Sequence, residues 1–471
     1  MPINSTADLL PGDRVISAET VLHEGDPLYL ASNRPALANA IDSICHQSGE
    51  YLVPFAASSL KHHDHLVEQN LFRCLFGRDS LIISELLYDK KPELLKASIL
   101  ALARHQGERF DPASEEEPGR IAHEVRTSED PQKARIEADS GWRFPYYGSV
   151  DASLLWLIAL ERIVSSEPKF LNFKNADISI SKRAELVASW VLTRLESGHG
   201  FVRSNSSNPK GILNQVWKDS GDSYLTSSGE VAIEPGTVSV ETVAQTYDAL
   251  LAAARLASLA EERWLISPAE LFQAAKTQQE KLLSEFWHSD FFAMGLGIIA
   301  GKERRLDAIA SNQWRLLDSA ILLNLDASFA KSLIDSVTDS EILGPHGIRT
   351  LASSNPRYRP GGYHTGSSWP VDATLIFRGL LRHGAFAEAR VIADRTLSAI
   401  EATGCYPEMF RSDDSERAGI STAVVDVWDS DLNRENRICQ PPQLMQGWTI
   451  ASYSYLKRSE QLSSRASLLE S

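Results

Sequence analysis

Carboxylate side chains in two irregular segments are the strongest candidates for chemistry in this sequence. Asp219 and Asp222 stand three residues apart in the Gly/Ser-rich segment Trp217–Ser223. Glu408 lies between a proline and two apolar residues, a setting in which a carboxyl group is expected to have a perturbed pKa or a dedicated partner. Two carboxyl groups that face one pocket from separate loops can cleave a glycosidic bond, because one protonates the leaving oxygen while the other activates water or attacks directly.

Short polar segments elsewhere supply groups that could hold a sugar. Arg78 and Asp79 place a donor fork and an acceptor side by side before a helical run, and sugar hydroxyls require paired donors and acceptors in a small space. Tyr363–Asp372 is dense in aromatic and hydroxyl side chains, which suits a pyranose ring. Simpler interpretations exist: Asp79 can cap the following helix, and Asp219 with Asp222 can form an Asx-type turn.

The stretch 62–65 resembles a metal site at first sight. His62, His63 and His65 are near neighbours, but adjacent side chains point in different directions in any regular element, and no cysteine completes a zinc spacing. We therefore expect no metal and no cofactor.

The composition restricts the class of partner. Among 471 residues, 47 are Lys or Arg and 62 are Asp or Glu, so the net charge is -15. Such an acidic chain is disfavoured as a binder of nucleic acid or of an anionic membrane. No run of about 18 apolar residues and no secretory signal are visible, and four scattered cysteines predict reduced thiols in the cytoplasm. Its Trp, Tyr and His residues suffice to build a site for a small neutral polar ligand; the oligomeric state is open.

Helical runs alternate with long irregular connections along the chain. In each run apolar residues recur at helical spacing, and the order is one helix, five pairs and one helix. The six long connections are rich in Gly, Pro, Trp or His. The predicted runs are Ala36–His46, Ser80–Leu87, Pro92–Arg104, Val150–Val164, Ser181–Leu195, Val240–Ala260, Pro268–Phe286, Gln313–Leu325, Ser328–Val337, Asp372–His383, Phe386–Ala402 and Trp448–Ser459.

This order predicts an all-α fold. If the first and last helices pair, six hairpins close into an (α/α)6 toroid of twelve helices, with the long loops on one end. An open helical solenoid is the alternative, but no repeated signature of its kind occurs. We expect residues 1–35 to form an extended leader packed on the barrel, and residues 36–471 to form the catalytic barrel. Short strands are expected within loops at Val231–Ile233 and Leu296–Ile299.

The motifs in the long loops resemble those of glycogen-debranching, amylo-α-1,6-glucosidase-like enzymes. That superfamily of (α/α)6-barrel glycoside hydrolases includes trehalases, glucoamylases and the glucosylglycerate and mannosylglycerate hydrolases. The matching blocks occur in the same order from about residue 70 to residue 450. They are Phe76–Ser80, Glu115–Glu124, Tyr146–Asp151, Trp217–Ser223, Gly347–Leu351, Tyr363–Asp372, Tyr406–Phe410 and Cys439–Gln443.

The resemblance implies a role for each matching residue. The Trp-x-Asp position, Asp219, would be the general acid, and the Pro-Glu position, Glu408, the general base. Asp222 lies close enough to compete with Asp219. Because these enzymes invert anomeric configuration, the two carboxyl groups are expected roughly 6.5–9.5 Å apart, with water between them. The residues expected to bind or line the substrate are Arg78, Asp79, Tyr147, Trp217, Asp222, His364, Trp369 and Gln443.

The function that the resemblance implies is an inverting, exo-acting α-glycosidase that releases a terminal sugar, expected to be glucose. Hydrolysis of glucosylglycerate or mannosylglycerate is an alternative, and would need a cation near the second subsite. Four arginines are candidates for that cation: Arg126, Arg143, Arg203 and Arg349. From another reaction class, a sugar epimerase on the same barrel would require His123, His346 and His364 to converge.

Overall fold

The computed structural model describes residues 21–22, 34–58, 72–339, 341–413, 420–421, 423–429, 434–440 and 443–470. The histidine-rich stretch 62–65 and most of the expected leader lie outside these residues. The described residues of the leader are 34–35 and β1 (Val21–Leu22), which pairs antiparallel with β15 (Ile420–Ser421).

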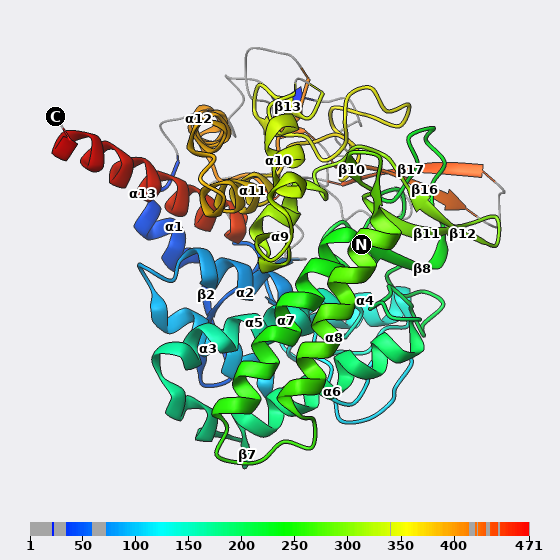
Figure 1. The fold of residues 1–471 in the computed structure, drawn as a ribbon, viewed down its shortest axis with the longest axis vertical. Helices are drawn as coiled ribbons and strands as arrows, with labels where there is room; N and C mark the ends of the chain where they lie inside the picture. Colours follow the sequence, from blue (N-terminus) through cyan, green and yellow to red (C-terminus); the bar gives the residue numbers. More distant parts are fainter. Residues whose placement is uncertain are drawn as a thin grey trace.

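The described chain is rich in helix, as the sequence predicts (Figure 1). Each of the twelve expected runs contains a helix, and most ends agree within three residues. The α-helices are α1 (Leu37–Ile44), α2 (Gly77–Leu86), α3 (Pro92–Ala103), α4 (Pro131–Ser140), α5 (Asp151–Ser166), α6 (Ile180–Ser197), α7 (Val240–Leu259), α8 (Pro268–Lys281), α9 (Ala320–Leu323), α10 (Ala327–Ser336), α11 (Pro370–Arg382), α12 (Phe386–Thr403) and α13 (Gly447–Glu470).

Local signals explain several of the helix starts. Ser267 accepts a hydrogen bond from the backbone N–H of Glu270 at the start of α8, and Pro268 occupies the first turn. Ser179 and Asp326 cap α6 and α10 in the same way. A side-chain acceptor at the N-cap satisfies a backbone donor that has no partner within the helix, and proline fits where no such donor is needed.

Two expected helices differ from the prediction. The run Gln313–Leu325 is divided into a 3-10 helix, η6 (Trp314–Asp318), and the short α9, with Ser319 capping the latter. The run Pro268–Phe286 ends in a π-helical turn, η5 (Leu282–Phe286). The sequence interpretation missed α4, because its polar sequence buries only Ile136 and Ser140 and lacks an apolar stripe.

Six helical segments contact one another in an order that returns to its start. In sequence order α2 contacts α5, and α5 contacts α7. The next segment is η6 together with α9, and both contact α7. From there η6 contacts α11, α11 contacts α13, and α13 contacts α2. Each is also in contact with the second member of its pair: α2 with α3, α5 with α6, α7 with α8, α9 with α10, α11 with α12 and α13 with α1. We call the first set the inner helices.

The inner helices begin in the same region of the molecule. Arg78 at the start of α2 contacts Asp151 at the start of α5, and Arg315 in η6 contacts Asp372 at the start of α11. Trp369, directly before α11, packs edge-on against Trp448 at the start of α13, with ring centroids 5.6 Å apart. Four inner helices carry an acidic residue in the first turn, where the helix dipole favours negative charge: Asp79, Asp151, Glu241 and Asp372.

Short strands decorate the loops. The strand expected at Leu296–Ile299 is present as β11 (Gly295–Ile299), which pairs with β12 (Lys302–Leu306) and β8 (Glu234–Ser239). The strand expected at Val231–Ile233 is wrong, because Val231 makes only an isolated bridge to Leu225 and the strand begins at Glu234. The other strands are β2 (Cys45–Ser48), β3 (Tyr51–Pro54), β4 (Leu75–Phe76), β5 (Glu124–Val125), β6 (Lys174–Asn175), β7 (Ile178–Ser179), β9 (Trp287–His288), β10 (Phe291–Phe292), β13 (Leu343–Gly344), β14 (Gly347–Ile348), β16 (Ala423–Asp429) and β17 (Arg434–Gln440).

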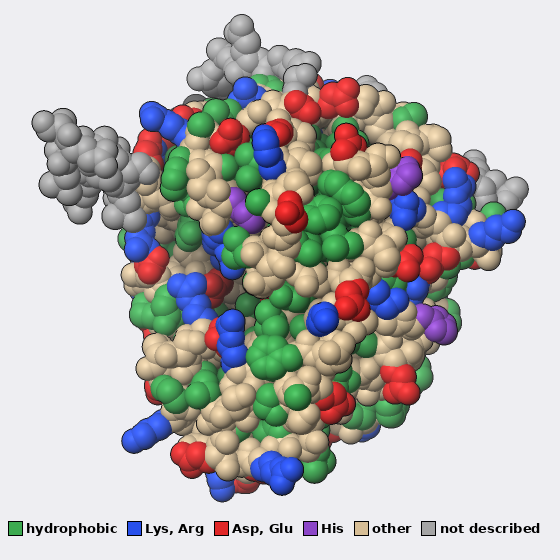
Figure 2. All heavy atoms as spheres, in the orientation of Figure 1, with side chains coloured by type: hydrophobic (Ala, Val, Ile, Leu, Met, Phe, Trp, Pro, Cys, Tyr) green, Lys and Arg blue, Asp and Glu red, His purple; other side chains and the backbone are tan. Residues whose placement is uncertain are grey.

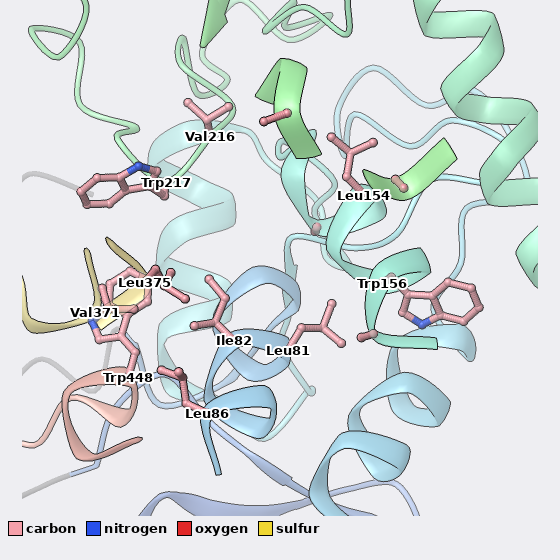
Figure 3. Close-up of a cluster of buried hydrophobic side chains, with 14 of the residues drawn as sticks. Leu81, Ile82, Leu86, Leu154, Trp156, Val216, Trp217, Val371, Leu375 and Trp448 are labelled. Carbon is pink, nitrogen blue, oxygen red and sulfur yellow. The ribbon is translucent and has the colours of Figure 1, made fainter. Parts of the chain in front are cut away.

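One large apolar cluster runs through the inner helices and reaches the Trp217 loop. Figure 3 shows Leu81 and Ile82 of α2 close to side chains of α5, α11 and α13, with Trp217 beside the same cluster. None of the helices among the described residues is both long and apolar enough to cross a bilayer.

Candidate active site

Arg78 is the electrostatic centre of the region where the inner helices begin. Its guanidinium lies 3.2 Å from Asp79, 3.4 Å from Asp151 and 3.7 Å from Asp219. Asp151 in turn accepts a hydrogen bond from the hydroxyl of Ser149. The side chain of Arg78 is 6% exposed, so its charge acts on these carboxylates with little screening by water.

Asp219 reaches this centre from the long connection before α7. Its side chain is 32% exposed, far more than the 6% of Arg78, so solvent reaches this carboxyl group. Burial raises the pKa of Asp219 to about 6, against the opposing effect of Arg78. A carboxyl group with such a pKa keeps part of its proton near neutral pH, as a general acid must.

Glu408 is buried and held by two donors. The Tyr363 hydroxyl donates to Oε1 at 2.7 Å, and the backbone N–H of Gln443 donates to Oε2 at 3.3 Å. Burial raises the pKa of Glu408 to about 7; these two hydrogen bonds lower it, and the charges of Asp79 and Asp219 raise it. Donors to both oxygens favour the ionised carboxylate, which is the form that a general base uses.

The two carboxyl groups belong to one electrostatic unit. The charge of Asp219 acts on Glu408, and the Tyr363 phenol feels both of them. Asp79 acts on both as well. Asp79 is itself buried, and burial raises its pKa to about 6 in spite of Arg78. Ionising either of Asp219 and Glu408 therefore makes ionisation of the other harder.

The loop that carries Asp219 is anchored by the two residues before it. The indole N–H of Trp217 donates to Glu241 at the start of α7. The ammonium of Lys218, fully buried, donates to Asn312 Oδ1 at 2.6 Å and to the carbonyl of Thr350 at 2.7 Å. Burial lowers the pKa of Lys218 to about 8. These contacts fix the backbone on one side of Asp219.

An aromatic wall continues from Trp217 to the Tyr363–Trp369 segment. The His364 ring lies 5.4 Å from Trp217 and stacks on Trp369 at 5.2 Å. Its Nδ1 accepts from the backbone N–H of Ser220 at 3.4 Å and lies 2.9 Å from the Ser220 hydroxyl, while its Nε2 is buried and makes no hydrogen bond. Because Nδ1 accepts, Nε2 carries the proton and is a donor left over for a ligand.

The remaining expected site residues differ in how they are placed. Trp369 is buried, and its indole N–H is used internally, on the Tyr363 carbonyl at 2.8 Å. Asp222 is 7% exposed and accepts from the Ser220 hydroxyl at 2.9 Å. Gln443 contacts Glu408 through its backbone. Trp369 is therefore part of the aromatic wall, and Gln443 holds Glu408 through its backbone N–H.

Tyr147 is turned away from these groups. Its hydroxyl donates to the carbonyl of His105 at 2.9 Å, and the charges that act on it are those of Glu116, Glu108 and Arg109. None of the carboxyl groups around Arg78 is among them. The structure therefore gives Tyr147 a bond within its own loop instead of a place beside Asp219.

Sequence reasoning missed several residues of this centre. Asp151 contacts Arg78, and Tyr363 donates to Glu408. Lys218 donates to Asn312, and Glu241 accepts from Trp217. Three of the four stood inside the matching motif blocks. For Asp151 and Glu241 an available signal was position, since four of the inner helices carry an acid in the first turn after a long loop. In the described part of the chain, no three His, Cys, Asp or Glu side chains are grouped to hold a metal ion.

Comparisons with known proteins indicate a class of enzyme. Residues 215–423, which include Asp219 and Glu408, match the family described as mannosylglycerate hydrolase MGH1-like glycoside hydrolase domain. Together with the shared fold below, this match supports a glycoside hydrolase. No curated protein matches the chain in sequence.

Solved structures share the fold at low sequence identity. The GH63 mannosylglycerate hydrolase from Thermus thermophilus in complex with Tris is 13% identical, with a TM-score of 0.60 over 89% of this chain and 99% of that chain. The same enzyme with Tris and D-glycerate gives a TM-score of 0.59 at 13% identity, over 90% and 100%. Its complex with glucose gives 0.58 at 13% identity, over 89% and 98%. The expected resemblance to glycoside hydrolases is confirmed.

Proposed function

We propose that the protein is an inverting, exo-acting α-glycosidase that removes a terminal α-linked hexose, with Asp219 as general acid and Glu408 as general base. The observation that carries this proposal is a chain of contacts between the two loops. Tyr363 donates to Glu408 and packs against His364, whose Nδ1 lies 2.9 Å from the hydroxyl of Ser220, next to Asp219. Hydrolysis of a glycosidic bond needs a pair of carboxyl groups, one group protonated and the other ionised.

The accessibility and the hydrogen bonds of the two groups support their different roles. Burial raises the pKa of Glu408 to about 7 and that of Asp219 to about 6, so the productive form, protonated Asp219 with ionised Glu408, is the less populated of the two singly protonated forms. Asp219 is the more accessible of the two and would protonate the leaving oxygen of a bound glycoside. Glu408, held by two donors, would accept a proton from a water molecule. That water attacks the anomeric carbon as the bond to the leaving oxygen breaks, so the sugar leaves with inverted configuration.

Asp219 is a better candidate acid than Asp222. It lies 3.7 Å from Arg78 and its charge reaches Glu408. Asp222 is more buried and accepts a hydrogen bond from Ser220. We therefore assign Asp222 to support of the loop or to sugar binding.

The terminal sugar would be held by Arg78, Asp79 and His364. Asp79 supplies an acceptor and Arg78 supplies donors, which together match vicinal hydroxyl groups. The unpartnered Nε2–H of His364 supplies one more donor beside an aromatic wall. Trp217 and Trp369 provide the apolar surface behind it.

The fold proposal follows from the helix contacts. The inner helices contact one another in a closed order, with an outer partner for each. This order supports an (α/α)6 toroid formed by residues 36–471 as one unit, in which the loops that precede the inner helices meet at one end. Residues far apart in sequence then share one site.

A second candidate substrate is mannosylglycerate or glucosylglycerate, favoured by the description of the matched family. Each of the four arginines proposed to bind the glycerate group has a partner within the protein. Arg126 pairs with Glu124 and Asp130, and Arg203 donates to the Gly198 and Gly236 carbonyls. Arg349 donates to the Ser412 carbonyl, and Arg143 is 68% exposed beside Asp111. The second candidate therefore rests on the family description and not on these four arginines.

An epimerase is disfavoured by the same centre. His364 lies against Trp217 and His123 packs between Phe76 and Tyr146, and the charge of Arg78 acts on both imidazoles. Burial holds the pKa of both imidazoles well below the usual range. The carboxyl pair provides acid and base without them.

A substrate panel tests the proposal. α-Glucosides, α-mannosides, α-glucosylglycerate and α-mannosylglycerate are incubated with the protein, and free hexose is measured. We expect release from at least one α-glycoside and none from the β-linked counterparts. Preference for the glycerate glycosides over neutral ones would select the second candidate, and epimerisation without release of hexose would contradict hydrolysis.

A further inference from the structure

A cavity lies among the inner helices, and its lining does not include Asp219 or Glu408. Its volume is about 470 Å³, within the range of small-molecule pockets. On α2 the site residues Arg78 and Asp79 lie in the first turn, and the cavity residue Glu85 lies six positions after Asp79. Likewise α5 starts with Asp151 and lines the cavity with Arg162. Figure 2 shows a hollow with basic and acidic side chains on its rim.

The charges around this rear cavity balance. Arg378 binds Asp318 through two nitrogens at 2.8 and 2.5 Å, and Arg255 lies 3.3 Å from Glu161. Glu85 pairs with Arg162. Five arginines face five acidic residues in the lining: Arg162, Arg255, Arg315, Arg378 and Arg382 against Glu85, Glu161, Glu241, Asp248 and Asp318. A ligand with net charge would therefore disrupt pairs that are already satisfied.

The backbone adds a bias against anions. The inner helices α2 and α11 end near this cavity, since Glu85 and Arg382 belong to their last turns. The negative ends of helix dipoles then point toward it and disfavour a negatively charged ligand.

Acceptors and donors remain for a neutral ligand. Glu85 Oε2 is buried and has no hydrogen-bond partner. Asp248 accepts from the backbone N–H of Ala320 at 3.0 Å, and burial raises its pKa to about 7, so its carboxyl group can also donate near neutral pH. Aliphatic lining from Leu81, Ile158 and Leu251 supplies apolar surface. Hydroxyl groups on a small carbon skeleton match this mixture.

We propose that the rear cavity binds a small neutral polyhydroxylated molecule, of the size of a free monosaccharide, with Glu85 as an acceptor for one of its hydroxyl groups. This site is separate from the Asp219 site, and it does not depend on the proposed reaction. Its inner end includes Glu241 and Arg315, and Glu241 also holds Trp217. Neither residue is suitable for a test, because changing it would disturb both sites.

Equilibrium dialysis with radiolabelled D-glucose tests the site. Gln245→Trp on α7 fills the cavity, and Leu259→Trp, at an exposed residue near the end of the same helix, adds the same side chain outside it. We expect Gln245→Trp to bind one glucose fewer per chain than Leu259→Trp, whatever the front site binds. Equal numbers of bound glucose in the two variants would overturn the proposal.

Two further comparisons sharpen the test. Glu85→Gln replaces an acceptor oxygen by an amide while keeping the size, and should weaken the rear site several-fold without removing it. D-Glycerate, an anionic probe, should bind equally to both tryptophan variants, and a difference between them would overturn the neutral-ligand assignment. If a thermal melt shows that Gln245→Trp is unfolded, Leu155→Trp on α5, which also lines the cavity, replaces it.

Discussion

Asp219 and Glu408 differ less in their chemistry than in what surrounds them. Asp219 is open to solvent beside Arg78, whereas Glu408 is enclosed and receives two hydrogen bonds. Sequence reasoning selected both residues from their motif positions. It could not select Tyr363 as the partner of Glu408, because a hydrogen bond over 45 residues depends on how two loops meet.

Removing either carboxyl group should abolish turnover and spare folding. We predict that Asp219→Asn and Glu408→Gln each lower kcat by about a thousand-fold or more, since general acid–base catalysis contributes about 10²–10⁴-fold per group. Asp222→Asn is the matched control and should lose much less. Steady-state rates on the best substrate of the panel, with melting temperatures alongside, measure this. A near-native rate in either variant would refute its assignment.

The pH dependence should be a narrow bell. Activity rises with pH as Glu408 loses its proton and falls as Asp219 loses its own, and burial raises these pKa values to about 7 and about 6. We therefore predict a maximum of kcat/KM between about pH 6 and 7. In Asp219→Asn the pKa of Glu408 should fall, because the charge that raises it is gone. A rate independent of pH across this range would contradict the pairing.

At the scale of elements, the loops carry chemistry and the helix starts place it. The periodic apolar residues of the inner helices predicted their positions well. Helix α4 and the 3-10 start of η6 were not predictable in this way, because α4 buries only Ile136 and Ser140 and η6 is a single short turn. Tyr147 illustrates the same limit, since its motif position does not determine which carbonyl its hydroxyl finds.

The start of α2 tolerates no side chain at Gly77. A Cβ added there would lie 2.2 Å from the carbonyl oxygen of Ala122, so Gly77→Ala must move the turn that presents Arg78 and Asp79. We predict a loss of about 1–3 kcal/mol in the free energy of unfolding, together with weaker sugar binding. Denaturant unfolding and KM measure the two effects.

Gly221→Ala is the control for that variant. A Cβ at Gly221 meets no atom within 4 Å, so its stability should be close to wild type. Equal stability of the two alanine variants would show that the contact of Gly77 with Ala122 does not position the helix start.

At the scale of the whole molecule, the ring order of helices explains how residues 79, 219 and 408 come together. Each lies at or before the start of a different inner segment, and the contact between α13 and α2 closes the order. The alternation of helices and long loops predicted hairpins and favoured a ring. Closure itself rests on contacts between residues hundreds of positions apart, which no local pattern encodes.

The anomeric form of the first product is the most direct measurement of how Asp219 and Glu408 work together. One-dimensional proton NMR follows the anomeric signals during the first minutes of hydrolysis of an α-glycoside, before mutarotation equilibrates them. If Glu408 delivers water opposite to Asp219, the β-anomer of the sugar appears first. Early accumulation of the α-anomer would show retention, and would contradict an acid and a base acting across a shared water.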